Sequence, residues 1–367
     1  MSNTTRFSEL DWLRVILILT VFLHHVFMPF NGDGWHIMNL ETSKVLDDIM
    51  VYFEQLRLQT LFFIAGASSL LLLQKLNAKA FFMSKLHRLF VPLIIGMMLI
   101  VPPQNYFENI NDYDSLLSAY GQLIFSFDSN HLWFIEFLIV FMIMAVPFKL
   151  FLDSNKGNSL IQRLVKLANK KHGLFSIVIA LILLRSGIKY AMPSESHQIE
   201  NLSLSLFFLF FFLMGMCFIK SKSVWQALTT HRKTNLAWLL ISSVIFYGYY
   251  FPDLSPYLSL EWRWQIWWLV CSLVSWSGLL TIVGYAGVYF EKTPDWLYQT
   301  NALIYPFYIL HQTAIVVFAF HIVQWQANIA VKSLSLLFSS LLVCAVICYY
   351  LIRPFKVTRY LFGLKPQ

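Results

Sequence analysis

Long apolar segments, separated by short connections, are the feature that most constrains the fold of this chain. A transmembrane helix needs about 20 mostly apolar residues, and a lipid bilayer admits only helices and closed barrels. Charged residues make up 13% of the chain, whereas a soluble domain carries about 25%. The sequence therefore predicts an all-α, polytopic integral membrane protein, a single transmembrane domain over residues 1–367. By the length criterion we expect about ten transmembrane helices, at roughly 11–30, 50–74, 88–106, 132–152, 173–192, 202–219, 236–252, 264–284, 300–322 and 333–352.

The distribution of charge predicts the orientation of these helices. The chain holds 27 Lys and Arg residues against 19 Asp and Glu, a net charge of +8. Most of the basic residues fall in alternate connections, and the positive-inside rule places those connections, with both termini, in the cytoplasm. The positive charge is thus a topology signal, and we expect no nucleic-acid partner. The four cysteines lie in apolar runs without metal-ligand spacing, so no metal site is expected.

The first apolar segment contains two ionisable residues that an ordinary membrane anchor does not need. Arg14 and His25 are eleven residues apart, which on a helix places them within about 20° of one face and about 16 Å apart along the axis. The neighbouring His24 points about 100° away. Ionisable residues inside a membrane are costly and mark functional sites. The alternative is that Arg14 extends to lipid headgroups while His25 satisfies a neighbouring backbone group.

The second and fourth segments also carry charge. The second is expected to begin early, as an amphipathic run from Ser43, and it contains Arg57 near one boundary. Its small residues 66–69 predict close helix packing, or else room for a substrate channel. Glu136 lies about two turns into the fourth segment. It either orients an imidazole, pairs with Arg57, or is protonated.

A polar stripe crosses the segment Thr300–Gln312. Asn301, Tyr305, Tyr308 and Gln312 follow a 4-3-4 spacing and share a helix face, and His311 lies three residues after Tyr308, close enough to hydrogen-bond. A polar seam between helices is the alternative to a functional site.

Most of these residues fall within motifs spread over nearly the whole chain. The motifs are Arg14, ten residues and His25; Trp35-His36; RLQTLFFIAG at Arg57–Gly66; KLHRLFVP at Lys85–Pro92; HLWF at His131–Phe134; and NALIYPFYILH at Asn301–His311. In these motifs the sequence resembles the membrane-bound acyltransferase-3 family, and most of all its glucan-biosynthesis protein C branch of proposed glucan succinyltransferases. Ala65 stands where the family pattern usually has serine, so no role of that hydroxyl is carried over.

The resemblance implies a multi-pass enzyme of a bacterial-type inner (cytoplasmic) membrane. It would move an acyl group, acetyl or succinyl, from cytoplasmic acyl-CoA to a hydroxyl of an extracytoplasmic carbohydrate such as a glucan. Acyl-CoA would be a donor substrate, with no tightly bound cofactor. The expected catalytic residues are His25, Glu136 and His311; the residues for the donor are Arg14 and Arg88; those for the substrate are Trp35, His36, Arg57, His131, Trp133, Asn301 and Tyr308.

The residues agree with this assignment, although they leave alternatives open. An imidazole titrates near neutral pH and suits a general base, while Arg14 could hold the anionic groups of CoA. General-base catalysis and a covalent acyl-histidine are not distinguished. The alternative function is a multi-span transporter or flippase without acyl-transfer chemistry. A carrier, however, need not place an arginine and a histidine at the length of a pantetheine arm.

Overall fold

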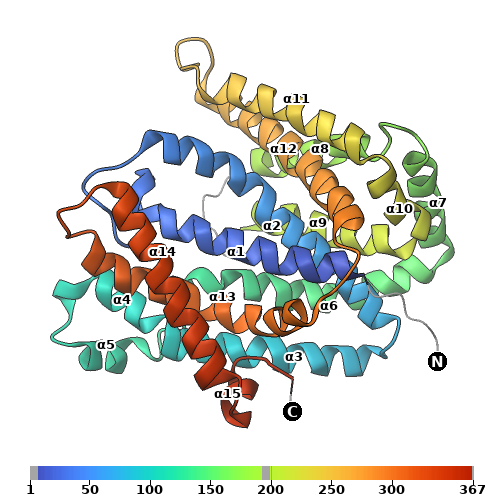
Figure 1. The fold of residues 1–367 in the computed structure, drawn as a ribbon. Helices are drawn as coiled ribbons and strands as arrows, with labels where there is room; N and C mark the ends of the chain where they lie inside the picture. The colour runs from blue at the N-terminus through green and yellow to red at the C-terminus, as the bar shows by residue number, and fades with distance from the viewer. Residues whose placement is uncertain (1–6, 192–198, 200, 366–367) are drawn as a thin grey trace. The chain divides into compact units, whose positions relative to one another are not determined.

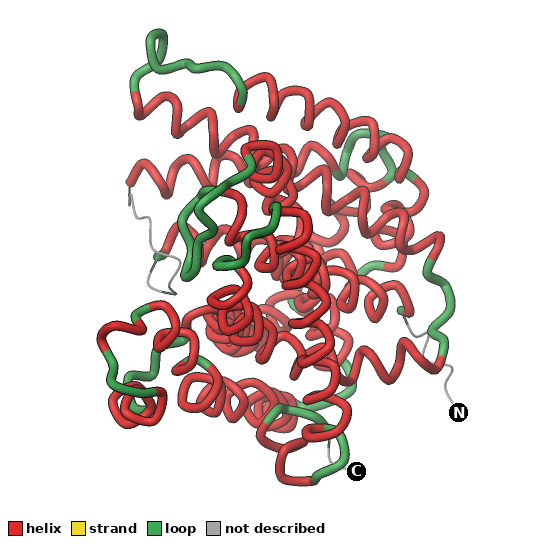
Figure 2. The backbone as a smooth tube through the Cα atoms, turned by 60° about the vertical axis from the view of Figure 1, so that its left-hand side comes forward, coloured by secondary structure: helices red, strands yellow, loops and turns green. Residues whose placement is uncertain are grey.

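The computed structural model describes residues 7–191, 199 and 201–365, and every regular element in this part of the chain is helical (Figure 2). The α-helices are α1 (Ser8–Asn31), α2 (Lys44–Leu73), α3 (Ala78–Ile95), α4 (Pro102–Glu108), α5 (Leu116–Leu123), α6 (Trp133–Asp153), α7 (Asn155–Ala168), α8 (Val178–Ala191), α9 (Leu202–Lys220), α10 (Lys222–Thr230), α11 (Arg232–Tyr250), α12 (Leu260–Tyr289), α13 (Asp295–Ile322), α14 (Ile329–Val346) and α15 (Lys356–Leu361), labelled in Figure 1. Five short 3₁₀ or π stretches complete them: η1 (Gly96–Ile100), η2 (Ile110–Asp112), η3 (Asn130–Leu132), η4 (Phe175–Ile177) and η5 (Ile347–Ile352).

The prediction of an all-α polytopic membrane protein is confirmed. Within the described residues, 8 helical stretches are long and apolar enough to cross a membrane: Ser8–Asn31, Lys44–Leu73, Ala78–Glu108, Asn130–Asp153, Leu202–Lys220, Leu260–Tyr289, Asp295–Ile322 and Ile329–Ile352. The other two expected spans are helical as well. These two helices do not meet the requirement of length and hydropathy for a membrane span. Helix α8 has only 14 residues. Helix α11 has 19 residues, but its first turn is polar and its last turn contains tyrosines. Residue 192, the expected end of one span, lies outside the described residues.

The chain divides into two compact units. Unit 1 comprises residues 1–14, 54–81 and 140–293, and unit 2 comprises residues 15–53, 82–139 and 294–367. Four helices, α1, α2, α3 and α6, contribute residues to both units. The expectation of a single domain, like the cytoplasmic location of the termini, stays a prediction.

Unit 1 is built around the long helix α12, against which α8, α10 and α11 pack. Trp276 of α12 is fully buried, and its indole N–H donates to the carbonyl oxygen of Leu174 at 2.9 Å. The rings of Phe210, Phe211 and Phe218 on α9 surround this indole at 5.7–6.0 Å between centroids. Aromatic side chains of this size dominate the free energy of burial, so α9 and α12 form the centre of this unit.

Helices α2 and α9 approach each other at two glycines. A Cβ on Gly66 would lie 1.8 Å from the carbonyl oxygen of Phe212, and a Cβ on Gly215 would lie 1.9 Å from that of Phe63. Only hydrogen fits at either position, because the contact on each side is backbone. Gly66, the first of the small residues 66–69 of the second segment, therefore serves close helix packing, which is one of the two alternatives that the sequence left open for them. The early start of that segment is also confirmed, since α2 begins at Lys44.

Unit 2 places helix α13 between α4, α14 and the π-helical turns η1 and η5. The chain turns from α3 into α4 through η1, and Pro102 and Pro103 open α4, where a missing backbone N–H costs least. The stretches η1 and η3 meet at Gly96, where an added Cβ would lie 2.4 Å from Leu132 Cδ1 and would require that side chain to shift. This arrangement brings η3, with His131, against the middle of α13.

Candidate active site

A hydrogen-bonded pair of imidazoles joins α1 to α13 within unit 2. His311 is 1% exposed, and its Nδ1 lies 2.5 Å from the carbonyl oxygen of Tyr308. A carbonyl only accepts, so Nδ1 carries the proton and donates. In a neutral ring Nε2 is then an acceptor, and His25 Nδ1 lies 2.8 Å from it. His25 therefore donates through Nδ1, and its own Nε2 is the basic nitrogen of the ring.

Trp35 lies beside this pair. Its indole is nearly parallel to the His25 ring, with an interplanar angle of 11° and centroids 6.2 Å apart, and both side chains are half-buried. The adjoining His24 ring is 5.7 Å from His25 and tilted by 67°. The two histidines of the first span thus have different surroundings, and His25 is the one held by His311.

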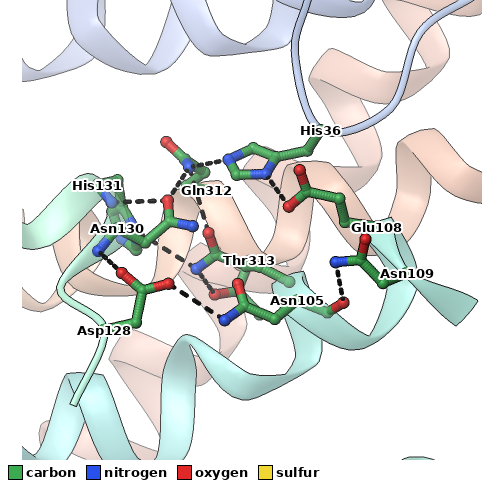
Figure 3. Close-up of polar contacts among 10 residues, drawn as sticks. His36, Asn105, Glu108, Asn109, Asp128, Asn130, His131, Gln312 and Thr313 are labelled. Carbon is green, nitrogen blue, oxygen red and sulfur yellow. Dashed lines mark hydrogen bonds and ion pairs between the residues drawn. The ribbon is translucent and has the colours of Figure 1, made fainter. Parts of the chain in front are cut away.

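The loop that carries Trp35 is fixed at His36. His36 Nδ1 lies 2.5 Å from a carboxylate oxygen of Glu108 on α4, and its Nε2 lies 3.0 Å from the amide nitrogen of Gln312 on α13 (Figure 3). The carboxylate accepts from Nδ1, and the amide donates to Nε2, so the neutral ring satisfies both partners. Because both nitrogens are engaged, His36 positions the loop.

Buried amides extend this network beneath the loop. Gln104 is 0% exposed, and its amide nitrogen donates to Thr313 Oγ1 at 2.6 Å and to His131 Nδ1 at 3.3 Å. Its amide oxygen accepts from Gln312, which also donates to Asn130 Oδ1 at 2.8 Å (Figure 3). A buried polar network of this kind is stabilising only when each member is paired. The Gln312 amide nitrogen has two hydrogens and three acceptors, His36 Nε2, Gln104 Oε1 and Asn130 Oδ1, at 2.8–3.2 Å, so it shares its two hydrogens among them.

His131 and Tyr308 are held entirely by protein groups. His131 Nε2 donates to the carbonyl oxygen of Ile309 at 3.0 Å, while its Nδ1 accepts from Gln104. The Tyr308 hydroxyl donates to the carbonyl oxygen of His131 at 2.5 Å. Both side chains were expected to contact substrate. The structure gives their polar atoms other partners, which fits a supporting role around His311.

A buried lysine anchors the far end of the same loop. Lys332 on α14 is 7% exposed, and its ammonium donates to Asn39 Oδ1 and to the carbonyl oxygen of Val323, both at 2.8 Å. The backbone N–H of Asn39 in turn donates to the carbonyl oxygen of Pro29 at 2.9 Å. The loop between α1 and α2 is therefore tied down at His36 and at Asn39, both of which follow Trp35 in the chain.

The expected donor residues lie on different elements. Arg14 belongs to the same continuous helix as His25, and it donates to Asp11 at 3.3 Å and to Ser68 Oγ at 3.2 Å. Arg88 on α3 is exposed, and its Nε donates to the carbonyl oxygen of Gly363 at 3.2 Å. Either guanidinium keeps surface through which an anion could bind. Their roles stay predictions.

The other residues predicted for the site are Asn301, Trp133, Arg57 and Glu136. Asn301 is eleven residues before Gln312 on α13, about 16 Å along the axis. Trp133 contacts the rings of Phe134 and Phe137 on its own helix. Arg57 belongs to unit 1 and Glu136 to unit 2, and their pairing stays a prediction. The carboxylate that contacts an imidazole in this network is Glu108.

Several members of the network were not predicted as site residues: Gln104, Glu108, Asn130, Gln312, Thr313 and Lys332. The sequence held a weak signal for two of them. Gln312 belonged to the polar stripe, and Gln104 follows a Pro-Pro pair at the end of an apolar segment. No group of three or more His, Cys, Asp or Glu residues in the described part of the chain could hold a metal ion.

Comparison with known proteins decides the family. The acyltransferase domain profile Acyl_transf_3 matches residues 7–353. The chain belongs to the acyltransferase-3 family. Among curated relatives, glucans biosynthesis protein C of Escherichia coli K12 is 25% identical over 230 residues, 56% of this chain and 56% of that protein. The protein of the same name from E. coli O1:K1 / APEC is 26% identical over 230 residues, with the same shares.

The chain thus aligns with little more than half the length of these relatives, and no solved structure matches it. The resemblance inferred from the motifs is confirmed, and the chain is a member of a family of acyl-transferring enzymes.

Proposed function

We propose that this protein is a membrane O-acyltransferase that moves an acyl group from cytoplasmic acyl-CoA to a hydroxyl of an extracytoplasmic carbohydrate such as a glucan. The observation that carries the proposal is the orientation of His25. A buried His311, itself bound to a backbone carbonyl, holds His25 with Nε2 as its basic nitrogen. Family membership supports acyl transfer, and the name of the relatives, glucans biosynthesis protein C, supports a glucan acceptor.

In the proposed reaction His25 is a general base. Its Nε2 takes the proton of the acceptor hydroxyl while the hydroxyl oxygen attacks the thioester carbonyl carbon. The tetrahedral intermediate collapses, the C–S bond breaks, and the proton passes from His25 to the departing CoA thiolate. During this step the imidazolium still donates from Nδ1 to His311 Nε2, and a hydrogen bond from a charged donor is stronger than one from a neutral ring. His311 therefore stabilises the imidazolium form of His25, which the reaction creates.

The donor would reach His25 along α1. Arg14 and His25 are separated by eleven residues of one unbroken helix, about 16 Å. That length is comparable to an extended pantetheine arm, so Arg14 would hold anionic groups of CoA while the thioester lies near His25. Arg88 is a second candidate for a phosphate contact. We propose acetyl or succinyl as the transferred group.

The acceptor would bind at Trp35. Sugar rings have apolar faces, and a half-buried indole beside the base gives such a face a flat partner. The contacts of His36 and Lys332 hold the loop in place and limit the entropy lost when the acceptor binds.

Glycan mass spectrometry tests this proposal against a transporter without chemistry. Cells that lack the gene should contain glycans without one acyl mass, and the intact gene should restore it. Cells with the His25→Ala protein in the membrane should remain without it. Restoration of acylated glycan by His25→Ala, or unchanged glycans in the deletion strain, would contradict the proposed function.

A further inference from the structure

Unit 1 contains two arginines that lack hydrogen-bond acceptors among the described residues. Arg57 on α2 is 7% exposed, and its Nε is buried without a partner. Arg185 on α8 has a buried NH1 without a partner, and its Cζ lies 4.2 Å from the ring centroid of Phe207 on α9. The ring attracts the cation but accepts no conventional hydrogen bond from its N–H groups. A buried cation without an acceptor is among the most costly features of a protein interior.

The two arginines project from helices that share a neighbour. Helix α8 packs against α9, and α2 meets α9 through Phe62, whose ring is 4.7 Å from that of Phe208. Neither α8 nor α9 contains an aspartate or glutamate. Glu54 acts electrostatically on both arginines, yet no hydrogen bond joins it to either in the described part of the chain. Two cations thus face one carboxylate, which leaves positive charge in excess.

We propose that Arg57 and Arg185 form a binding site in unit 1 for an anionic group, a carboxylate or a phosphate. A guanidinium presents planar N–H donors that match the oxygens of these two groups, and such hydrogen bonds are stronger than neutral ones. The inference concerns binding alone and does not depend on the acyl transfer proposed above.

Binding of small anions to the purified full-length chain tests the site. We would titrate succinate, as the carboxylate probe, and inorganic phosphate in a low-salt HEPES buffer with a non-ionic detergent. At least one should bind and raise the melting temperature. Arg57→Met and Arg185→Met should each weaken binding about 10- to 100-fold, as expected for loss of a charge-assisted hydrogen bond. Without anion, each variant should melt at or above the wild-type temperature, because a buried guanidinium nitrogen that has no acceptor has been removed.

Arg232→Met is the matched control. Arg232 of α11 donates from NH1 to the carbonyl oxygen of Thr229, so its replacement should lower or preserve the melting temperature and leave anion binding unchanged. Melting temperatures in nanodiscs of anionic phosphatidylglycerol or of zwitterionic phosphatidylcholine show whether the bound anion is a lipid headgroup or a soluble molecule. Stabilisation by phosphatidylglycerol alone, lost in Arg57→Met, would identify a lipid phosphate as the ligand. Binding of succinate in detergent would identify a soluble carboxylate.

Two results would overturn the proposal. The first is that anions do not act at these arginines: either no probe and no anionic lipid stabilises the wild-type protein, or anion binding persists in both methionine variants. The second concerns Glu195 and Glu200, which lie outside the described residues. If the double variant Glu195→Gln/Glu200→Gln is less stable than wild type, and adding Arg57→Met removes that loss of stability, then a glutamate of the chain itself is the counter-ion of the arginine. Unchanged anion affinity and stability in the double glutamine variant supports the site.

Discussion

Replacing His311 tests how the proposed base is held. His311→Phe keeps an aromatic ring beside Phe22 and Phe307, whose centroids lie 6.4 and 6.3 Å from the imidazole, but it removes both nitrogens. His25 Nδ1–H then loses its acceptor. A hydrogen bond to a group that becomes charged is worth about 1.5–3 kcal/mol, and each 1.36 kcal/mol corresponds to about a factor of ten in rate. We therefore expect kcat to fall about 10- to 150-fold.

The loss should appear in kcat, with KM for acyl-CoA nearly unchanged, because His311 does not contact the donor in the proposed mechanism. The matched variant is His311→Gln, whose amide oxygen can occupy the place of Nε2 and accept from His25. It should recover most of the lost rate. Steady-state transfer by the purified variants, with melting temperatures measured alongside, checks this. If folded His311→Phe turns over like wild type, or if His311→Gln is no better than His311→Phe, His311 does not orient the base.

Other parts of the structure give three further expectations. Gly66→Ala should lower the free energy of unfolding by about 1–3 kcal/mol, since its Cβ would lie 1.8 Å from a backbone oxygen. The control Gly187→Ala, whose Cβ would have open space around it, should be neutral or stabilising by up to about 1 kcal/mol. Similar thermal shifts for both variants would refute the packing argument. Lys332→Met leaves two buried oxygens without their donor and should raise KM for the acceptor as the Trp35 loop loosens, whereas an unchanged KM would make the anchor purely structural. Arg14→Ala should weaken binding of acyl-CoA about tenfold or more in a calorimetric titration, and an unchanged Kd would remove Arg14 from the donor site.

The sequence could predict the spans because hydropathy is a local property. The expected segment 202–219 matches α9 closely, and 333–352 ends where the stretch Ile329–Ile352, made of α14 and η5, ends, since the apolar residues of each are contiguous. The pairing of α1 with α13 was not predictable in the same way. His25 and His311 are 286 positions apart, and helical periodicity says which residues share a face but not which helices meet.

The site was predictable in part for the same reason. The sequence placed His311 within reach of Tyr308, and the structure shows that the partner is the backbone carbonyl of Tyr308. Glu108 was not predicted as a site residue, although it holds His36. Its role depends on α4 turning back against α13, a tertiary contact that no local pattern records.

The most direct test of the account is acyl transfer in a purified system. Proteoliposomes would contain wild type, His25→Ala or His24→Ala, with radiolabelled acyl-CoA on one side and a glucan acceptor on the other. A general base contributes about 10²–10⁴-fold to the rate. We predict that His25→Ala folds, still binds acyl-CoA and transfers at that reduced rate, while His24→Ala loses far less. Near-normal label transfer to the glucan by folded His25→Ala would contradict the central claim.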